Sequence, residues 1–336
     1  MTESKTVLFL CAFILSIFTR CGQKSTGENS TNIAPIHFNY TNITGIGHEP
    51  GCTRRDPSDV ILVENTYYVY YTKVYGTSPG YWGTVWCASS RDKGYSWNEE
   101  GEVLGKGDHG AFDSQATFTP NIIRANNKYY LFYTGVKPTP DRIDGKFENN
   151  STTDITAIGL AMAESPIGPF TRIYKNPVLE VSGQKENFDS YRVDDSSLLF
   201  RDDKYWLYYK GRSRKHGTEG PSQTQMGVAF SKNIEGPYTK YSTPILPESH
   251  EVLIWPYKGG VMTLASKSST LEFAPDGIDF LSDKKAIKVT DRPNAPGALR
   301  PELTQLSPNE NGIRWGISMV HNGDEAYLIR FDCKTE

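Results

Sequence analysis

Acidic side chains recur near the start of several similar aromatic segments, and they are the residues best suited to chemistry. Asp56 precedes the first such segment, Asp194 lies at a corresponding place in a later one, and Glu251 follows His250 in a third. A carboxylate can activate water, an acid or imidazole can protonate a leaving oxygen, and further negative charge stabilises a cationic transition state. The set predicts acid–base hydrolysis, provided that the fold brings these segments together.

Each of these residues also has a purely structural interpretation. An aspartate before proline or serine often starts a turn by accepting a hydrogen bond from its own backbone, and a lone histidine usually lies on the surface or has a structural role. Asp59, Asp202 and Asp203 are assigned to turns or sheet edges in this way. The combination of Asp56, Asp194 and Glu251 at segment starts is harder to explain by turns alone, so it favours a functional site.

Other polar residues at the same segment starts are predicted to bind substrate. They are Arg55, Asp113, Gln115, Arg192, Asp195, Arg300 and Glu302. Cysteine, histidine and acidic residues show no spacing typical of a metal centre. No cofactor is expected to be required, and a central structural cation is left open.

An internal repeat indicates how these positions are brought together. The segment FDSQATFTPNIIRANNKYYLFYTG from Phe112 aligns without gaps with FDSYRVDDSSLLFRDDKYWLYYKG from Phe188. The segment RRDPSDVILVENTYYVYYTK from Arg54 joins the pattern when Tyr67 is placed on Tyr129, which aligns Asp56 with Phe118 and Asp194. Each copy has an apolar strand, a polar turn and a tyrosine-rich strand, so each is predicted to form a β-hairpin.

A second, looser hairpin follows each of these copies, beginning near Thr84, Ile158 and Met226. Two hairpins make a four-stranded antiparallel sheet, and radial repetition of such sheets makes a propeller. Fainter units begin near His250 and Arg300. The predicted fold is therefore an all-β, single-domain propeller with five four-stranded blades, whose last blade is completed by a strand around His37 to Tyr40. The first strand of each blade lines the channel, so the acidic residues would meet at one mouth.

Composition agrees with a packed β domain and excludes several partners. Aromatic residues make up 12% of the chain, with 20 Tyr and 6 Trp, and these residues suit pleated surfaces and also stack on sugar rings. The formal net charge is −3. No concentrated basic patch is present in the sequence, so a nucleic-acid partner is not expected.

The N-terminal residues have the pattern of an export signal. The first residues, Met1 to Lys5, are followed by the apolar run Val7 to Phe18 and then by Cys21-Gly22, and the run is short for a membrane span. The sequence predicts a signal at 1–21, with Cys21 as a candidate lipidated residue, a polar segment at 22–45 and the propeller at 46–336. The protein is expected to cross the bacterial inner membrane and to stay periplasmic or lipid-anchored at the envelope.

Several motifs resemble glycoside hydrolase family 117, the 3,6-anhydro-L-galactosidases of red-algal galactan breakdown. These motifs are RDPSDVI at Arg55, FDSQATFTPN, RVDDSSLLF and the triplet Ser249-His250-Glu251. More distantly, the Asp-Pro-Ser start resembles the five-bladed families 43 and 32. The family resemblance implies an inverting, exo-acting enzyme that releases terminal α-1,3-linked 3,6-anhydro-L-galactose or a related galactoside from oligosaccharides.

The same resemblance implies a role for each acidic residue. Asp56 matches the general base, Asp194 the carboxylate that tunes the acid, His250 the general acid and Glu251 a transition-state stabiliser. Asp195 takes the role of Asp194 if the register slips by one residue. The segment between Cys21 and Asp56 lacks the helical periodicity of the family's N-terminal region, which leaves the oligomeric state open.

Two alternatives remain. One is an arabinofuranosidase or xylosidase of the family 43 type, in which Glu248 or Glu251 would be the acid. The other is a sugar-binding propeller without catalysis, which would tolerate the loss of Asp56.

Overall fold

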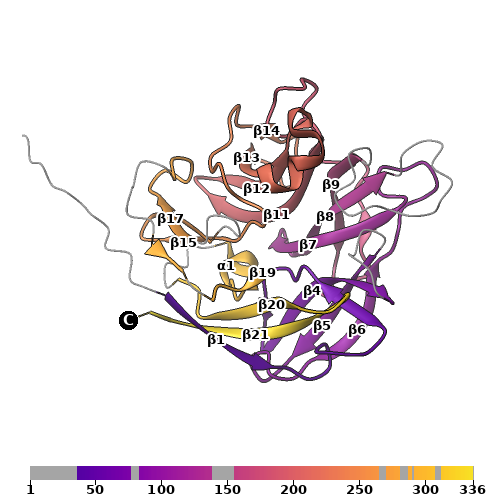
Figure 1. The fold of residues 1–336 in the computed structure, drawn as a ribbon. Helices are drawn as coiled ribbons and strands as arrows, with labels where there is room; N and C mark the ends of the chain where they lie inside the picture. The colour runs from indigo at the N-terminus through magenta and orange to yellow at the C-terminus, as the bar shows by residue number, and fades with distance from the viewer. Residues whose placement is uncertain are drawn as a thin grey trace, which may run out of the picture. The chain divides into compact units, whose positions relative to one another are not determined.

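In the computed structural model of the chain, residues 36–76, 83–137, 155–264, 270–280, 287–289, 291–306 and 312–335 are described. They form five antiparallel sheets arranged radially about a centre, as Figure 1 shows. All of them belong to the compact unit Ala34–Glu336. The predicted five-bladed, single-domain propeller is confirmed. The expected signal at 1–21, with Cys21, lies outside the described residues.

Blades 2 and 3 are the most regular, and they carry the ungapped repeat. Blade 2 consists of β7 (Ala116–Ala125), β8 (Lys128–Lys137), β9 (Ile155–Ala163) and β10 (Thr171–Arg172). Blade 3 consists of β11 (Arg192–Arg201), β12 (Lys204–Arg212), β13 (Gln225–Ser231) and β14 (Thr239–Lys240). In both blades the strands are paired in sequence order, so each blade is two consecutive hairpins.

The other three blades follow the same plan. Blade 1 consists of β2 (Cys52–Arg55), β3 (Ile61–Val63), β4 (Thr66–Tyr75), β5 (Thr84–Ser90) and β6 (Asn98–Leu104). Blade 4 consists of β15 (Ile254–Tyr257), β16 (Gly260–Leu264), β17 (Thr270–Ala274) and β18 (Ile287–Lys288). Blade 5 consists of β19 (Asn294–Ala298), β20 (Trp315–Asn322), β21 (Glu325–Thr335) and β1 (Ile36–Asn42).

The strand β1 closes the ring by pairing with β21 from the other end of the chain. Its register places Phe38 opposite Cys333 and Tyr40 opposite Phe331, and the two strands lie side by side in Figure 1. The strand expected around His37 to Tyr40 is therefore confirmed. Closure by the N-terminal strand ties the first described residues to the last blade, which leaves no open end between blades 1 and 5.

The polar turns of the inner hairpins have the conformation that their residues favour. Asn126 and Asn127, like Asp202 and Asp203, have φ angles of 50–60°. Asn and Asp tolerate this left-handed region better than other non-glycine residues, and two such residues in a row fit the tight hairpin turn that matches strand twist.

The Phe-Asp-Ser start of the repeat packs against the hairpin that follows it in blades 2 and 3. Phe112 stacks on Tyr133 at 6.1 Å between ring centroids, and Phe188 stacks on Tyr209 at 6.0 Å. A Cβ at Gly135 would lie 2.4 Å from the Phe112 ring, so a glycine is needed for this close approach. The repeated motif is thus explained by packing of the hairpin against its leading loop.

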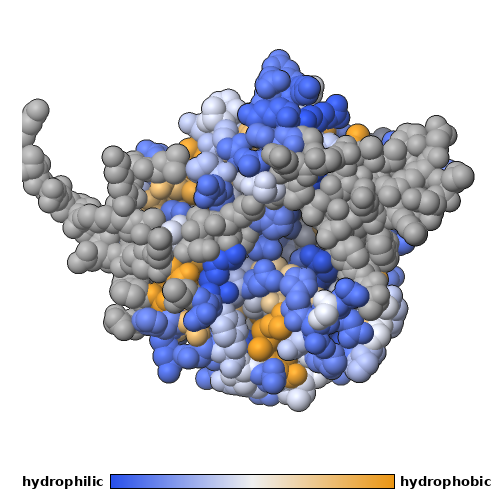
Figure 2. All heavy atoms as spheres, in the orientation of Figure 1, coloured by the Kyte–Doolittle hydropathy of each residue, from blue (hydrophilic) through white to orange (hydrophobic). Residues whose placement is uncertain are grey.

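In the described part of the chain, helical structure is limited to the 3₁₀ segment η1 (Arg214–Gln223) and the four-residue helix α1 (Glu302–Gln305). Among the described residues no helix has the length and apolar character needed to cross a bilayer. The visible surface of the described residues is mostly hydrophilic with scattered apolar side chains (Figure 2). The apolar residues instead pack between the blades, with the largest cluster joining blades 1, 2 and 3.

Candidate active site

A small cavity of about 40 Å³ lies at the centre of the ring, and all five blades contribute to it. Each blade supplies residues that lie within its inner strand or just before it. The lining residues are Asp56, Pro57, Ser58, Asp59, Thr119, Pro120, Asn121, Asp195, Ser196, Glu251, Val252, Ala295 and Pro296. This cavity is here called the central pocket.

A repeated backbone feature directs side chains into the central pocket. Asp56, Thr119, Asp195 and Ala295 have φ angles of 49°, 45°, 50° and 43°. At Thr119, Asp195 and Ala295 the hydrogen-bonded pairing with the next strand is interrupted. In β7 the interruption lies between Phe118 and Asn121, and β11 and β19 are interrupted at the equivalent places. A β-bulge re-aims a side chain, and positive φ at a non-glycine residue costs about 1–3 kcal/mol. Strain at four equivalent positions therefore marks the pocket wall.

This feature corrects the register expected from sequence. Asp56 is equivalent to Thr119 and Asp195, whereas the expected alignment placed Asp56 on Phe118 and Asp194. From Asp56 to the turn residue Glu64 there are eight steps, but from Thr119 to Asn126 and from Asp195 to Asp202 there are seven. Blade 1 thus has one additional residue between its strained position and its turn, which an ungapped alignment could not accommodate.

Asp56 is held by its neighbour Arg55. The Arg55 Nε atom donates to Asp56 Oδ2 at 2.8 Å, and both side chains are largely buried, with exposed fractions of 18% and 13%. The predicted pair Arg55 and Asp56 is therefore brought together at the wall, although Arg55 itself holds the acid and is not among the lining residues.

Asp195 lies on the same wall within a cluster of two acids and one lysine. Lys210 Nζ is 2.5 Å from Asp195 Oδ2 and 3.3 Å from Asp194 Oδ1. Burial, opposed by the Lys210 charge and assisted by the charges of Asp194 and Asp56, raises the pKa of Asp195 to about 8. Asp194 lies behind Asp195 and does not line the pocket.

Glu251 completes the set of acids on the wall. It lies before β15, and its Oε2 atom accepts a long hydrogen bond from the backbone N–H of Ala295 at 3.4 Å. His250 is not among the lining residues, and its Nδ1 atom lies 3.4 Å from Thr224 Oγ1. The structure therefore places Asp56, Asp195 and Glu251 around one cavity, with Asp194 and His250 immediately behind.

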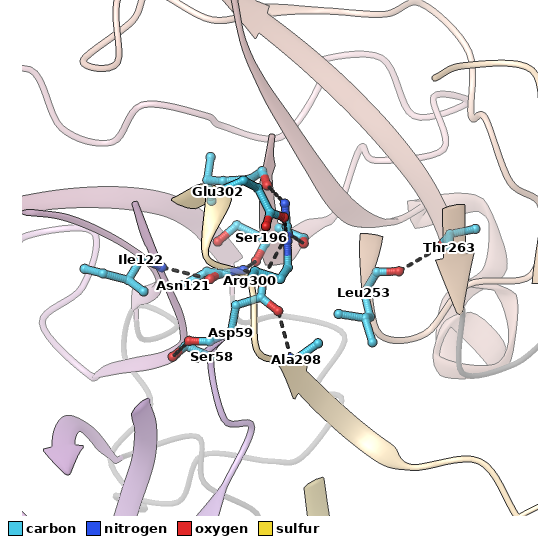
Figure 3. Close-up of polar contacts among 12 residues, drawn as sticks. Ser58, Asp59, Asn121, Ile122, Ser196, Leu253, Thr263, Ala298, Arg300 and Glu302 are labelled. Carbon is cyan, nitrogen blue, oxygen red and sulfur yellow. Dashed lines mark hydrogen bonds and ion pairs between the residues drawn. The ribbon is translucent and has the colours of Figure 1, made fainter. Parts of the chain in front are cut away.

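A buried ion-pair network forms the floor of the central pocket. Arg300 donates through Nη1 to Asp59 Oδ2 at 3.0 Å and through Nε to Glu302 Oε1 at 2.7 Å. Asp59 also accepts from Asn121 and from the backbone of Ala298. Figure 3 shows Arg300 between the two acids where segments of several blades converge. Each of these three side chains is at most 6% exposed.

Three residues of this network have assignments from the sequence. Arg300 and Glu302 were expected to bind substrate, and Asp59 was expected in a turn or at a sheet edge. Besides its contacts with the two acids, Arg300 donates to the carbonyl of Leu198 at 2.6 Å. Its donors are therefore directed to protein acceptors. Asp59 lines the central pocket and Glu302 lines a separate groove beside the β11–β12 turn, so the network separates the two cavities.

The remaining substrate-binding expectations lie outside the central pocket. Asp113 accepts from Arg172 at 2.6 Å and from the Tyr133 hydroxyl at 2.8 Å, so it fixes the loop before β7. Gln115 pairs through its backbone N–H with Val136. Arg192 is buried, and its guanidinium lies 5.4 Å from the Tyr191 ring centre. None of the three is among the residues that line the pocket.

Lys210 was missed by sequence reasoning. It lies in a tyrosine-rich strand, and nothing in that pattern distinguishes it from a surface lysine. Within the described part of the chain, no group of three or more His, Cys, Asp or Glu side chains is arranged to hold a metal ion.

Comparison with known proteins agrees with this geometry. The model of glycosyl hydrolases family 43 matches residues 52–197, which include Asp56 and Asp195. Zg3597, a family 117 glycoside hydrolase from the marine bacterium Zobellia galactanivorans, has a similar solved structure with a TM-score of 0.75. It is 27% identical, over 89% of this chain and 90% of that one. The protein is a five-bladed propeller glycoside hydrolase.

More distant structures share the fold of this hydrolase. A thermostable family 43 glycoside hydrolase superimposes with a TM-score of 0.54 at 16% identity, over 88% of this chain and 92% of that chain. Fructan 1-exohydrolase IIa from Cichorium intybus gives 0.58 at 14% identity, over 85% of this chain and 56% of that chain. No curated protein sequence matches the chain. The resemblance to family 117 among the propeller glycosidases, expected from the motifs, is confirmed.

Proposed function

We propose that this hydrolase is an exo-acting, inverting enzyme that releases a terminal α-1,3-linked 3,6-anhydro-L-galactose or a related galactoside from red-algal galactan oligosaccharides. The observation that carries the proposal is a small central pocket with Asp56, Asp195 and Glu251 on its wall. The buried Asp59–Arg300–Glu302 network lies between this pocket and a separate groove. In this proposal the network blocks passage of a polysaccharide through the channel, so that the pocket receives the end of a chain.

Each wall residue has a proposed role. Asp56, held in place by Arg55, activates the water. Asp195 retains its proton at neutral pH and donates a hydrogen bond to the sugar, which replaces the role that the motif resemblance gave to Asp194. Inversion requires the base and the acid to be about 6.5–9.5 Å apart, with room for water. Asp56 on blade 1 and Glu251 on blade 4 approach the pocket from different blades, which suits that separation.

The proton donor comes from the Ser249-His250-Glu251 triplet. The resemblance points to His250, but Glu251 is the member of the triplet that lines the pocket. We therefore propose Glu251 as the donor, with His250 supporting the turn through its contact with Thr224.

The substrate proposal is tested by product release from agar, porphyran, carrageenan and arabinan oligosaccharides, with wild type and Asp56→Asn compared. Release of anhydrogalactose by wild type, with a loss of about 10³-fold or more in kcat for Asp56→Asn, is the expected result. The match to the family 43 model favours a second candidate, an arabinofuranosidase or xylosidase, and release of arabinose or xylose would establish it. Equal sugar binding without turnover in both proteins would refute the enzymatic proposal.

We also propose that the enzyme is exported and is held at the cell envelope through Cys21. The supporting observation is the apolar run before Cys21-Gly22 in the sequence. Fractionation of cells that express wild type or Cys21→Ser tests this: the anchored protein moves from the membrane to the soluble periplasmic fraction when the cysteine is lost. Wild type already in the soluble fraction would refute the anchor.

A further inference from the structure

A second cavity lies far from the central pocket, between blades 2 and 3. It has a volume of about 690 Å³ and is lined by the β7–β8 turn, the end of β11, the start of β12 and the β13–β14 turn, together with Tyr174. We call it the blade 2–3 groove. The strained position Thr119 and the turn residue Asn126 are seven residues apart on one strand. At about 3.3 Å per residue the two cavities are separated by about 20 Å, so the groove is not part of the active site.

The groove combines an aromatic platform with polar groups in its wall. Tyr174 is 99% exposed, which is the highest value among the described large apolar side chains. Tyr130 and Tyr205 are buried in the wall, and Phe200 packs on Tyr205 at 5.0 Å between ring centroids. Asn126 hydrogen-bonds with the Tyr130 hydroxyl, and Glu235 is close enough for its charge to raise the pKa of Tyr130 after burial.

The charge of the lining is balanced. Lys175 and Lys232 lie in the groove together with Asp203 and Glu235. A balanced set does not favour a polyanion, and the hydroxyl, amide and carboxylate groups suit a ligand that both donates and accepts hydrogen bonds. Rings of tyrosine present an apolar face with a polar edge. A neutral sugar chain has the same two properties, with apolar ring faces and hydroxyl groups around them.

We propose that the blade 2–3 groove is a second glycan-binding site, which holds a neutral stretch of galactan while the central pocket receives a chain end. The inference rests on the proposed function for the identity of the polysaccharide, because the enzyme meets its substrate as part of a larger polymer. A site about 20 Å from the catalytic acids would raise the local concentration of chain ends without altering the chemical step.

The test uses retention on agarose beads, with Asp56→Asn as the background so that the polymer is not degraded. The Asp56→Asn protein is expected to be retained, Tyr174→Ala in that background to bind about tenfold more weakly, and Tyr174→Phe to bind like its parent, since the stacking ring is kept. Tyr95→Ala is the matched control, because Tyr95 is 46% exposed in the β5–β6 turn of another blade. Heavily sulfated carrageenan should bind less well than agarose.

A second measurement separates this inference from the proposed function. Tyr174→Ala with an intact Asp56 should hydrolyse a short oligosaccharide at the wild-type rate and should be slower only on agarose particles. Absence of turnover on every short galactan would refute the proposed function. Three outcomes with normal turnover on short oligosaccharides would refute the second site. They are no retention of the Asp56→Asn parent on agarose, retention of Tyr174→Ala in that background equal to that of the parent, and a loss of retention in Tyr95→Ala as large as in Tyr174→Ala.

Discussion

Replacing Lys210 by methionine would test the electrostatics of Asp195 directly. Lys210 lies opposite Asp194 in the β11–β12 pair. The equivalent position is Thr134 in blade 2 and Met319 in blade 5. Methionine is therefore a residue that the fold already accommodates at this place. The substitution removes a charge from the cluster with little change in side-chain length.

The expected effect follows from the two contacts of Lys210. Its Nζ atom lies 2.5 Å from Asp195 and 3.3 Å from Asp194, and its charge is the largest influence that lowers the pKa of Asp195. An opposite charge at such a distance lowers a carboxyl pKa by about 1–3 units. Its loss also leaves the charge of Asp194 uncompensated, so the pKa of Asp195 should rise by about 2–3 units.

The assay is the pH profile of kcat/KM on a short oligosaccharide. Because the protonated form of Asp195 is proposed to be active, activity falls as pH rises through about 8 in wild type. In Lys210→Met this alkaline limb should move about 2–3 pH units higher. Lys240→Met is the control, since Lys240 contacts Asp189 at 2.6 Å away from the pocket and should leave the limb in place. An unmoved limb in Lys210→Met, or a shift toward acid, would refute the reasoning.

Three further predictions concern the wall and floor of the pocket. Asp195→Asn should lower kcat but raise the free energy of unfolding. The gain should be larger at pH 8 than at pH 4, because the folded-state pKa of Asp195 lies above the unfolded one and ionisation opposes folding between them. Urea unfolding at several pH values measures this gain, and a gain independent of pH would contradict the prediction. Arg300→Met should lower the free energy of unfolding by about 3–5 kcal/mol, because it leaves Asp59 buried without its cation. Adding Asp59→Asn should recover part of this loss, whereas additive losses in the double variant would count against the pairing. Glu251→Gln should reduce kcat by about 10²–10⁴-fold, and its kcat should recover on an aryl glycoside whose leaving group needs no protonation. His250→Gln should lower kcat at most about tenfold. The reverse order would identify His250 as the donor.

The fold was predictable because its signals are local. Paired Asn or Asp residues between apolar and tyrosine-rich strands fix the hairpins, and these turns adopt the left-handed conformation that such residues favour. The Phe-Asp-Ser motif repeats because Phe112 and Phe188 stack on equivalent tyrosines. Each signal lies within one blade, so the number of blades and their order could be read along the chain.

The site was predictable only in part because it depends on contacts between blades. Asp56 and Glu251 were found because they stand at segment starts, but the extra residue in blade 1 moved the alignment from Asp195 to Asp194. The shared proline after the strained residue, Pro57 and Pro120, would have revealed the gap. The partnership of Asp59 with Arg300 joins residues 241 positions apart, and no local pattern predicts which distant cation a buried acid will contact.

The contrast between blades separates acids that serve the scaffold from acids that serve the site. Thr119 and Ala295 occupy the same strained position as Asp56 and Asp195, so the fold does not need a carboxylate there. Asp189, by comparison, meets both Lys240 and the Tyr209 hydroxyl outside the central pocket, as a structural acid should. Asp195 bears backbone strain and an unfavourable burial that Lys210 only partly offsets. Such a cost at a position where other blades have neutral side chains is best explained by chemistry.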